Sequence, residues 1–164
     1  MDIGEHQSRL LLTTLVCCLL LTTCSNASSA SPPTCPSDTP KLGIYDPSRL
    51  RVLDTCQSFH GVVIEAEQHN DGDLHILLRA DPNSTSFLNV ENVNRGGMVV
   101  EIVPGQQLPD PAVGDHLSVF GTWVLDTHNG WNEIHPVWAI TYPDGTIVQA
   151  LPPDPPEYQG SAKD

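Results

Sequence analysis

Apolar and polar residues alternate along much of the chain between about residues 50 and 142, which is the pattern of half-buried β-strands. Five segments predict strands, at residues 61–69, 73–80, 98–103, 116–126 and 131–142. The turn Asn70-Asp71-Gly72 joins the first two, because these residue types tolerate a positive φ. Thr127-His128-Asn129-Gly130 joins the last two. A helical turn is expected only near residues 87–92, between the second and third strands.

Strands joined by short turns predict an all-β domain at residues 50–142. We expect a small five-stranded antiparallel OB-like barrel, with a β-sandwich as the alternative. The expected helical turn departs from the usual OB arrangement, in which the helix follows the third strand. Residues 25–49 are rich in Ser, Pro and Thr and predict a flexible linker, whereas the acidic, Pro-rich residues 143–164 predict a disordered tail.

The N-terminus indicates export. Residues 10–21 form an apolar run of the length found in signal peptides, and too short for a membrane-spanning helix. Residues 21–24 (LTTC) resemble a lipobox, in which case residues 1–24 are the signal peptide and Cys24 carries the lipid. Cleavage after Ala30 would instead release a soluble secreted protein. We favour the lipoprotein.

Cysteine usage agrees with export. Cys17 and Cys18 lie in the leader, so removal of the leader and lipidation of Cys24 leave Cys35 and Cys56. An even pair of cysteines in an oxidising compartment predicts a disulfide.

The charge of the chain narrows the choice of partners. Twenty Asp and Glu against seven Lys and Arg give a formal net charge of −13. Such a surface repels phosphate backbones and anionic lipids, so we expect no nucleic-acid partner and membrane contact only through a lipid anchor. A small molecule, a protein or a divalent metal fits this charge better.

Several segments together resemble a known group of proteins. They are residues 49–56 (RLRVLDTC), 71–75 (DGDLH), 99–103 (VVEIV), 121–126 (GTWVLD) and 130–137 (GWNEIHPV). The sequence is similar to uncharacterised exported microbial proteins with an OB-like domain, over about residues 50–140. The resemblance implies the fold and export. It implies no activity and no catalytic residues.

Two histidines each share a strand face with an acid, because side chains alternate with a period of two. Asp73 and His75 form one pair, and Glu133 and His135 form the other. We expect Glu67 across from His75 and Glu101 on the same face. Imidazole and carboxylate are preferred ligands of zinc and related metals. The pattern therefore predicts a divalent metal, such as zinc, held by His75, Glu133 and His135, with a solvated polar surface as the alternative.

No catalytic residue is predicted, because no nucleophile motif or phosphate-binding loop is present in the sequence. Trp131, in the last turn, is the predicted aromatic contact for a ligand. The sequence favours a non-enzymatic binding module, envelope-attached or secreted, with a divalent metal as candidate cofactor. The alternatives are a metal-dependent hydrolase acting on an extracellular substrate, and an OB domain that binds oligonucleotides or saccharides.

Overall fold

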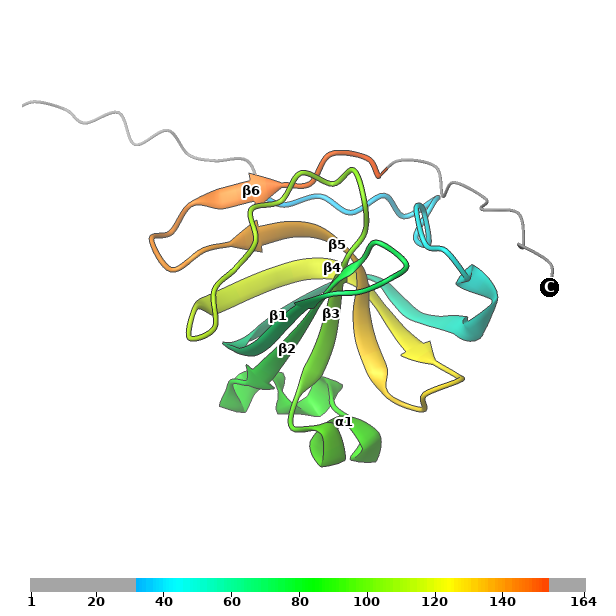
Figure 1. Cartoon of the computed structure of the whole chain (residues 1–164), viewed down its shortest axis with the longest axis horizontal. Coiled ribbons are helices and arrows are strands. Elements are labelled where there is room, and N and C mark those ends of the chain that lie inside the picture. The colour runs from blue at the N-terminus through cyan, green and yellow to red at the C-terminus, as the bar shows by residue number, and fades with distance from the viewer. Residues whose placement is uncertain (1–31, 154–164) are drawn as a thin grey trace, which may run out of the picture.

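The body of the protein is a ring of five strands, extended at one edge by a sixth (Figure 1). This computed structural model describes residues 32–153. The strands are β1 (Leu50–Gln68), β2 (Leu74–Ala80), β3 (Met98–Ile102), β4 (His116–Asp126), β5 (Asn132–Thr141) and β6 (Ile147–Gln149). Their order is β3-β2-β1-β4-β5-β6, and a parallel pairing of β3 with β5 closes the ring. The mostly antiparallel, all-β fold is the OB-like class that the sequence predicts.

Two short helical segments lie between β2 and β3, where the sequence predicts a helical turn. They are the 3-10 helix η2 (Pro82–Phe87) and α1 (Val90–Arg95). The α1 segment begins with a capping box, in which the Asn89 side chain accepts from the backbone of residues 91 and 92. It ends at Gly96, whose φ of 101° favours glycine. In Figure 1 both segments lie at one end of the ring.

The apolar core fills the inside of the ring. Its largest fully buried side chains include Phe59, Ile76, Leu78, Met98, Ile134 and Ile140. A register shift between Val63 and Glu65 changes which residues of β1 point inward. Val63 is therefore buried, whereas a regular alternation over residues 61–69 would place Val62 and Ile64 on the inner face.

The first strand is longer than predicted, because it begins at Leu50 rather than near Gly61. Residues 50–62 of β1 pair with the whole length of β4, from Leu50 opposite Asp126 to Val62 opposite His116. Two register shifts interrupt this pairing near Asp54. Irregular pairing of this kind breaks the alternation that would mark a strand in the sequence.

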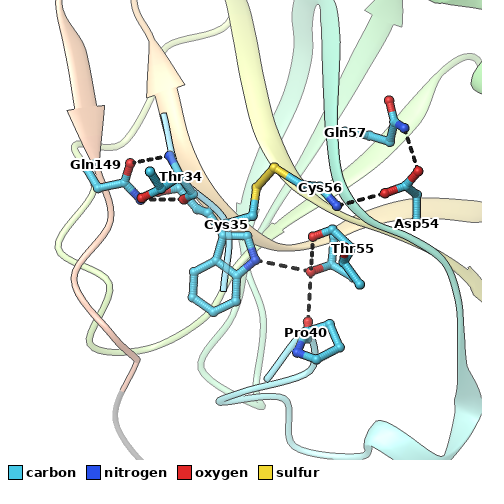
Figure 2. Close-up of a disulfide and its surroundings, with 10 residues drawn as sticks. Thr34, Cys35, Pro40, Asp54, Thr55, Cys56, Gln57 and Gln149 are labelled. Carbon is cyan, nitrogen blue, oxygen red and sulfur yellow. Dashed lines mark hydrogen bonds between the residues drawn. A yellow bond between two sulfur atoms is a disulfide. The ribbon is translucent and has the colours of Figure 1, made fainter. Parts of the chain in front are cut away.

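The predicted linker is wrong for the described residues that precede β1, which pack against the sheet. Cys35 is joined to Cys56 of β1 by the predicted disulfide, with the two Cα atoms 5.5 Å apart. Beside it, the backbone of Thr34 exchanges hydrogen bonds with the Gln149 side chain (Figure 2). Further along, Ile44 is buried, and the 3-10 helix η1 (Pro47–Arg49) leads into β1.

The predicted disordered tail is wrong for β6, which pairs antiparallel with β5. The Ala150 backbone continues the contact by donating to the Trp138 carbonyl. The folded domain therefore extends beyond the predicted residues 50–142 on both sides. On the C-terminal side, β6 pairs with the free edge of β5. On the N-terminal side, the disulfide holds the residues before β1 against the sheet.

The predicted leader, both candidate processing sites and Cys24 lie outside the described residues. Within residues 32–153, no helix has both the length and the apolar character needed to cross a membrane.

Candidate metal centre

The parallel pairing of β3 with β5 assembles a cluster of polar side chains on the outer face of the ring. Val100 and Ile134 are paired residues, and both point into the core. Because neighbouring side chains on a strand point to opposite faces, Glu101, Glu133 and His135 point outward. Asp73, just before β2, completes the cluster.

This outer face is not exposed to solvent. Asp73, Glu101, Glu133 and His135 are each at most 3% exposed. Beside them, Ile44 and Leu50 form a second apolar cluster with Val103 and Val124, and Val124 is the cross-strand partner of Glu133. The residues that lead into β1 therefore cover this face, and the interpretation of the cluster as a solvated polar surface is wrong.

His135 lies at the centre of the cluster. Its Nδ1 is 2.9 Å from Glu101 Oε2 and 3.3 Å from Glu133 Oε2, and its Nε2 is 3.5 Å from Asp73 Oδ2. One ligand atom each from Asp73, Glu101 and His135 lie within 4.8 Å of one another. Two carboxylates and an imidazole at this spacing could converge on one divalent ion.

Two polar atoms of the cluster are buried without a hydrogen-bond partner in the described structure: His135 Nε2 and Glu101 Oε2. The 2.9 Å contact of Glu101 Oε2 with His135 is close, but it does not have the alignment of a hydrogen bond. Buried polar atoms are nearly always satisfied, and a place for a bound ion is a recognised reason for an exception. His135 Nε2 lies on the side of Asp73, and Glu101 Oε2 lies on the side of His135 Nδ1.

The buried acids and His135 shift one another's pKa. Burial raises the pKa of Asp73 to about 7 and also raises that of Glu133. Burial disfavours the charged forms of His135 and Glu101, but the contact between the two side chains favours both charged forms and outweighs the effect of burial. The pKa of His135 therefore rises to about 10, and that of Glu101 falls. Three buried carboxyl groups therefore surround one central imidazole, and their contacts with it decide which of them is ionised.

His75, the third predicted ligand, lies on the other side of Glu101. Its Nε2 is 3.4 Å from Glu101 Oε1, and its ring stacks on that of His69 with centroids 3.5 Å apart. The structure thus brings Glu133 and His135 into contact, whereas the Glu101 carboxylate lies between His75 and His135. The register of β2 confirms two sequence expectations, since His75 pairs with Glu67 on one side and Glu101 on the other.

Asp73 and Glu101 are the candidate ligands that the sequence analysis placed on the face without assigning them to the metal. The sequence placed both residues near a predicted ligand, because Asp73 is two residues before His75 and Glu101 is the cross-strand partner of His75. What the alternation could not show is that their shared face is buried.

Trp131 is part of the same network. Its indole nitrogen donates to Glu133 Oε1 at 2.7 Å, and the Arg95 guanidinium lies 4.7 Å from the ring centroid. The side chain is half-buried rather than fully exposed. Its predicted role as a ligand contact stays a prediction.

A separate polar network lies between β1 and β4. His60 Nε2 contacts Ser58 Oγ at 3.0 Å, and His60 Nδ1 contacts Ser118 Oγ at 2.7 Å. A serine on each ring nitrogen replaces the acid that orients the histidine of a hydrolytic triad. This network therefore gives no reason to revise the expectation that the domain has no catalytic nucleophile.

A scan of protein-family models, a search of curated proteins and a search of solved structures each found no significant match to this chain.

Proposed function

We propose that this protein is an exported, non-enzymatic binding module that takes up a divalent first-row transition metal at the outer face of the β3–β5 pair. The observation that carries the proposal is His135 Nε2, an imidazole nitrogen buried beside carboxylates and without a hydrogen-bond partner. Asp73, Glu101 and His135 are the ligands, and Glu133 orients His135.

The proposed setting outside the cytoplasm is supported by the Cys35–Cys56 disulfide, a bond typical of non-reducing compartments. The apolar leader and the resemblance to exported microbial proteins point the same way. Intact mass of the mature protein distinguishes a lipid-modified Cys24 from a free N-terminus at Ser31.

A binding role is supported over a hydrolytic one by the burial of the three ligands. A hydrolytic metal needs an open coordination position for water and substrate. Asp73, Glu101 and His135 are enclosed, as ligands of structural metals usually are.

Metal binding is tested with the full chain, purified with its disulfide intact and stripped with a chelator. Titration with Zn²⁺ and Mn²⁺ in a calorimeter should show saturable binding. Glu101→Gln should weaken that binding by more than about 100-fold, since outer-shell changes alone cost about 10- to 100-fold. Glu65→Gln, an exposed glutamate on β1, is the matched control and should bind as the unchanged chain does. An unchanged chain that binds no metal at millimolar concentration would overturn the proposal.

A further inference from the structure

We infer that the centre holds two divalent cations rather than one, with the carboxylates of Asp73 and Glu101 shared between an inner and an outer position. This inference rests on the proposed function and deepens it. Asp73, Glu101 and His135 hold the inner ion, and Asp71, Asp73 and His75 hold the outer ion together with the second oxygen of Glu101.

Two sets of ligand atoms overlap at one residue. Asp71, Asp73 and His75 offer ligand atoms within 4.8 Å of one another, and so do Asp73, Glu101 and His135. Asp73 belongs to both sets, and its carboxylate has an oxygen for each ion. A carboxylate shared in this way is the usual bridge between paired metals, which lie about 3.5 to 4 Å apart.

Glu101 spans the same two positions. Its Oε1 lies 3.4 Å from His75 Nε2 in the outer set, and its Oε2 lies 2.9 Å from His135 Nδ1 in the inner set. Each oxygen of one carboxylate therefore faces a different imidazole. Asp73 likewise lies within reach of both histidines, since it is 3.5 Å from His135 Nε2 and shares a set of ligand atoms with His75.

Three of the buried polar atoms without a hydrogen-bond partner belong to these two positions. His135 Nε2 and Glu101 Oε2 are orphaned at the inner position, and His75 Nε2 is a buried atom without a hydrogen bond at the outer one. His75 is thus close to Glu101 without being satisfied by it. A single inner ion would satisfy His135 and leave His75 Nε2 without a partner, whereas two ions account for all three atoms.

The β1–β2 hairpin holds the outer ligands in place. Asp71 Oδ1 accepts a hydrogen bond from the Asp73 backbone at 3.2 Å, which keeps the two acids side by side. The stacked His69 ring, at an interplanar angle of 14°, fixes the orientation of His75. Asp71 is exposed, so the outer position lies at the edge of the centre, whereas the ligands of the inner position are enclosed.

The number of ions bound is the test. The stripped full chain is titrated with Mn²⁺ and Zn²⁺, with stoichiometry measured by calorimetry and native mass spectrometry and Mn–Mn coupling by electron paramagnetic resonance. We expect two equivalents and a spin-coupled Mn²⁺ pair. The double variant Asp71→Asn/His75→Ala should bind one equivalent with an uncoupled Mn²⁺ signal.

His116→Ala is the matched control, because His116 forms an acid–imidazole pair with Asp81 at 2.7 Å outside both sets. It should keep two equivalents. One equivalent in the unchanged chain would overturn this inference and leave the proposed function standing. Two equivalents that persist in the double variant would also overturn it, because the second ion would lie elsewhere. No binding at all would overturn the proposed function as well.

Discussion

His135 Nδ1 lies 2.9 Å from Glu101 Oε2 across the parallel β3–β5 pair. The β3–β5 pair also closes the five-strand ring, so the buried cluster is assembled when the ring closes. Neither β3 nor β5 carries the cluster alone. A metal that binds the cluster should therefore bind the folded ring far better than the unfolded chain.

Metal should consequently stabilise the fold. A ligand at about 100 times its dissociation constant adds about 2.7 kcal/mol to the free energy of unfolding when it binds only the folded state. Urea unfolding with saturating Zn²⁺, compared with chelator, measures this gain. Glu101→Gln should lose most of the gain and Glu65→Gln should keep it. An equal gain in both variants would place the stabilising metal outside this cluster.

Trp131 should report metal binding, because its indole donates to Glu133, which in turn contacts His135. We expect Zn²⁺ to change the tryptophan emission of the stripped protein. Trp131→Phe should remove that change. Trp138→Phe is the control, since the Trp138 indole donates to Thr122 instead. A metal-dependent signal that survives in Trp131→Phe and disappears in Trp138→Phe would contradict the network described here.

The alternation of apolar residues located most of the strands and the pairing of the first hairpin, because a period of two survives wherever the ladder is regular. It failed where the ladder is irregular. The shift after Val63 reversed the inward face of β1. Register shifts between β4 and β5 likewise put Val137 into the apolar cluster inside the ring, whereas Trp138 is buried outside that cluster and donates to Thr122.

Burial of the cluster could not be predicted from the same pattern. Asp73, Glu101 and His135 alternate with core residues as an exposed polar face does. What buries them is cover from residues distant in sequence, including Ile44 and Leu50. By contrast, the Cys35–Cys56 pairing was predictable, because Cys35 and Cys56 are the only two cysteines that follow the predicted leader and Cys24.

Loss of the disulfide should destabilise the domain without unfolding it. The bond spans a sequence separation of 21 residues, and loop-closure entropy for such a span is worth about 3 kcal/mol. Cys35→Ala/Cys56→Ala should therefore lower the urea midpoint while the far-ultraviolet circular dichroism of the sheet is kept. Thr34 and Gln149 lie beside the bond, so amide exchange in β6 should also accelerate. A midpoint equal to that of the oxidised chain would contradict the prediction.

Gly121 should be intolerant of a side chain because of its position against β5. A Cβ there would lie 2.5 Å from the Pro136 carbonyl oxygen and closer still to the Ile134 side chain. These two residues flank His135, so Gly121→Ala should cost about 1 to 3 kcal/mol of stability and weaken metal binding together. Urea unfolding and calorimetry on the same variant check both effects. Unchanged stability would show that β5 can move away from β4 at little cost.

The metal-free protein should lose stability as the pH rises from about 6.5 to 9. The pKa of His135 rises from 6.5 to about 10 on folding, because contact with Glu101 and Glu133 outweighs the effect of burial. A group whose pKa is raised by folding stabilises the folded state fully at a pH below its pKa in the unfolded chain. That stabilisation is lost as the pH rises to its pKa in the folded protein. Burial raises the pKa of Asp73 from 3.8 to about 7, so its contribution is lost from about pH 4 onward and is gone soon after pH 7.

The titrations of Asp73 and His135 therefore both lower the stability as the pH rises from 6.5 to 7. Above that range only the titration of His135 lowers it further. The urea midpoint of the stripped chain at pH 6.5, 7.5 and 9 measures the trend. His135→Gln should flatten it, since glutamine does not titrate, whereas His116→Ala should leave it in place. Saturating Zn²⁺ should also flatten it, because the ion takes the place of the proton on His135. A midpoint that rises with pH in the stripped, unchanged chain would show that His135 is neutral in the folded protein.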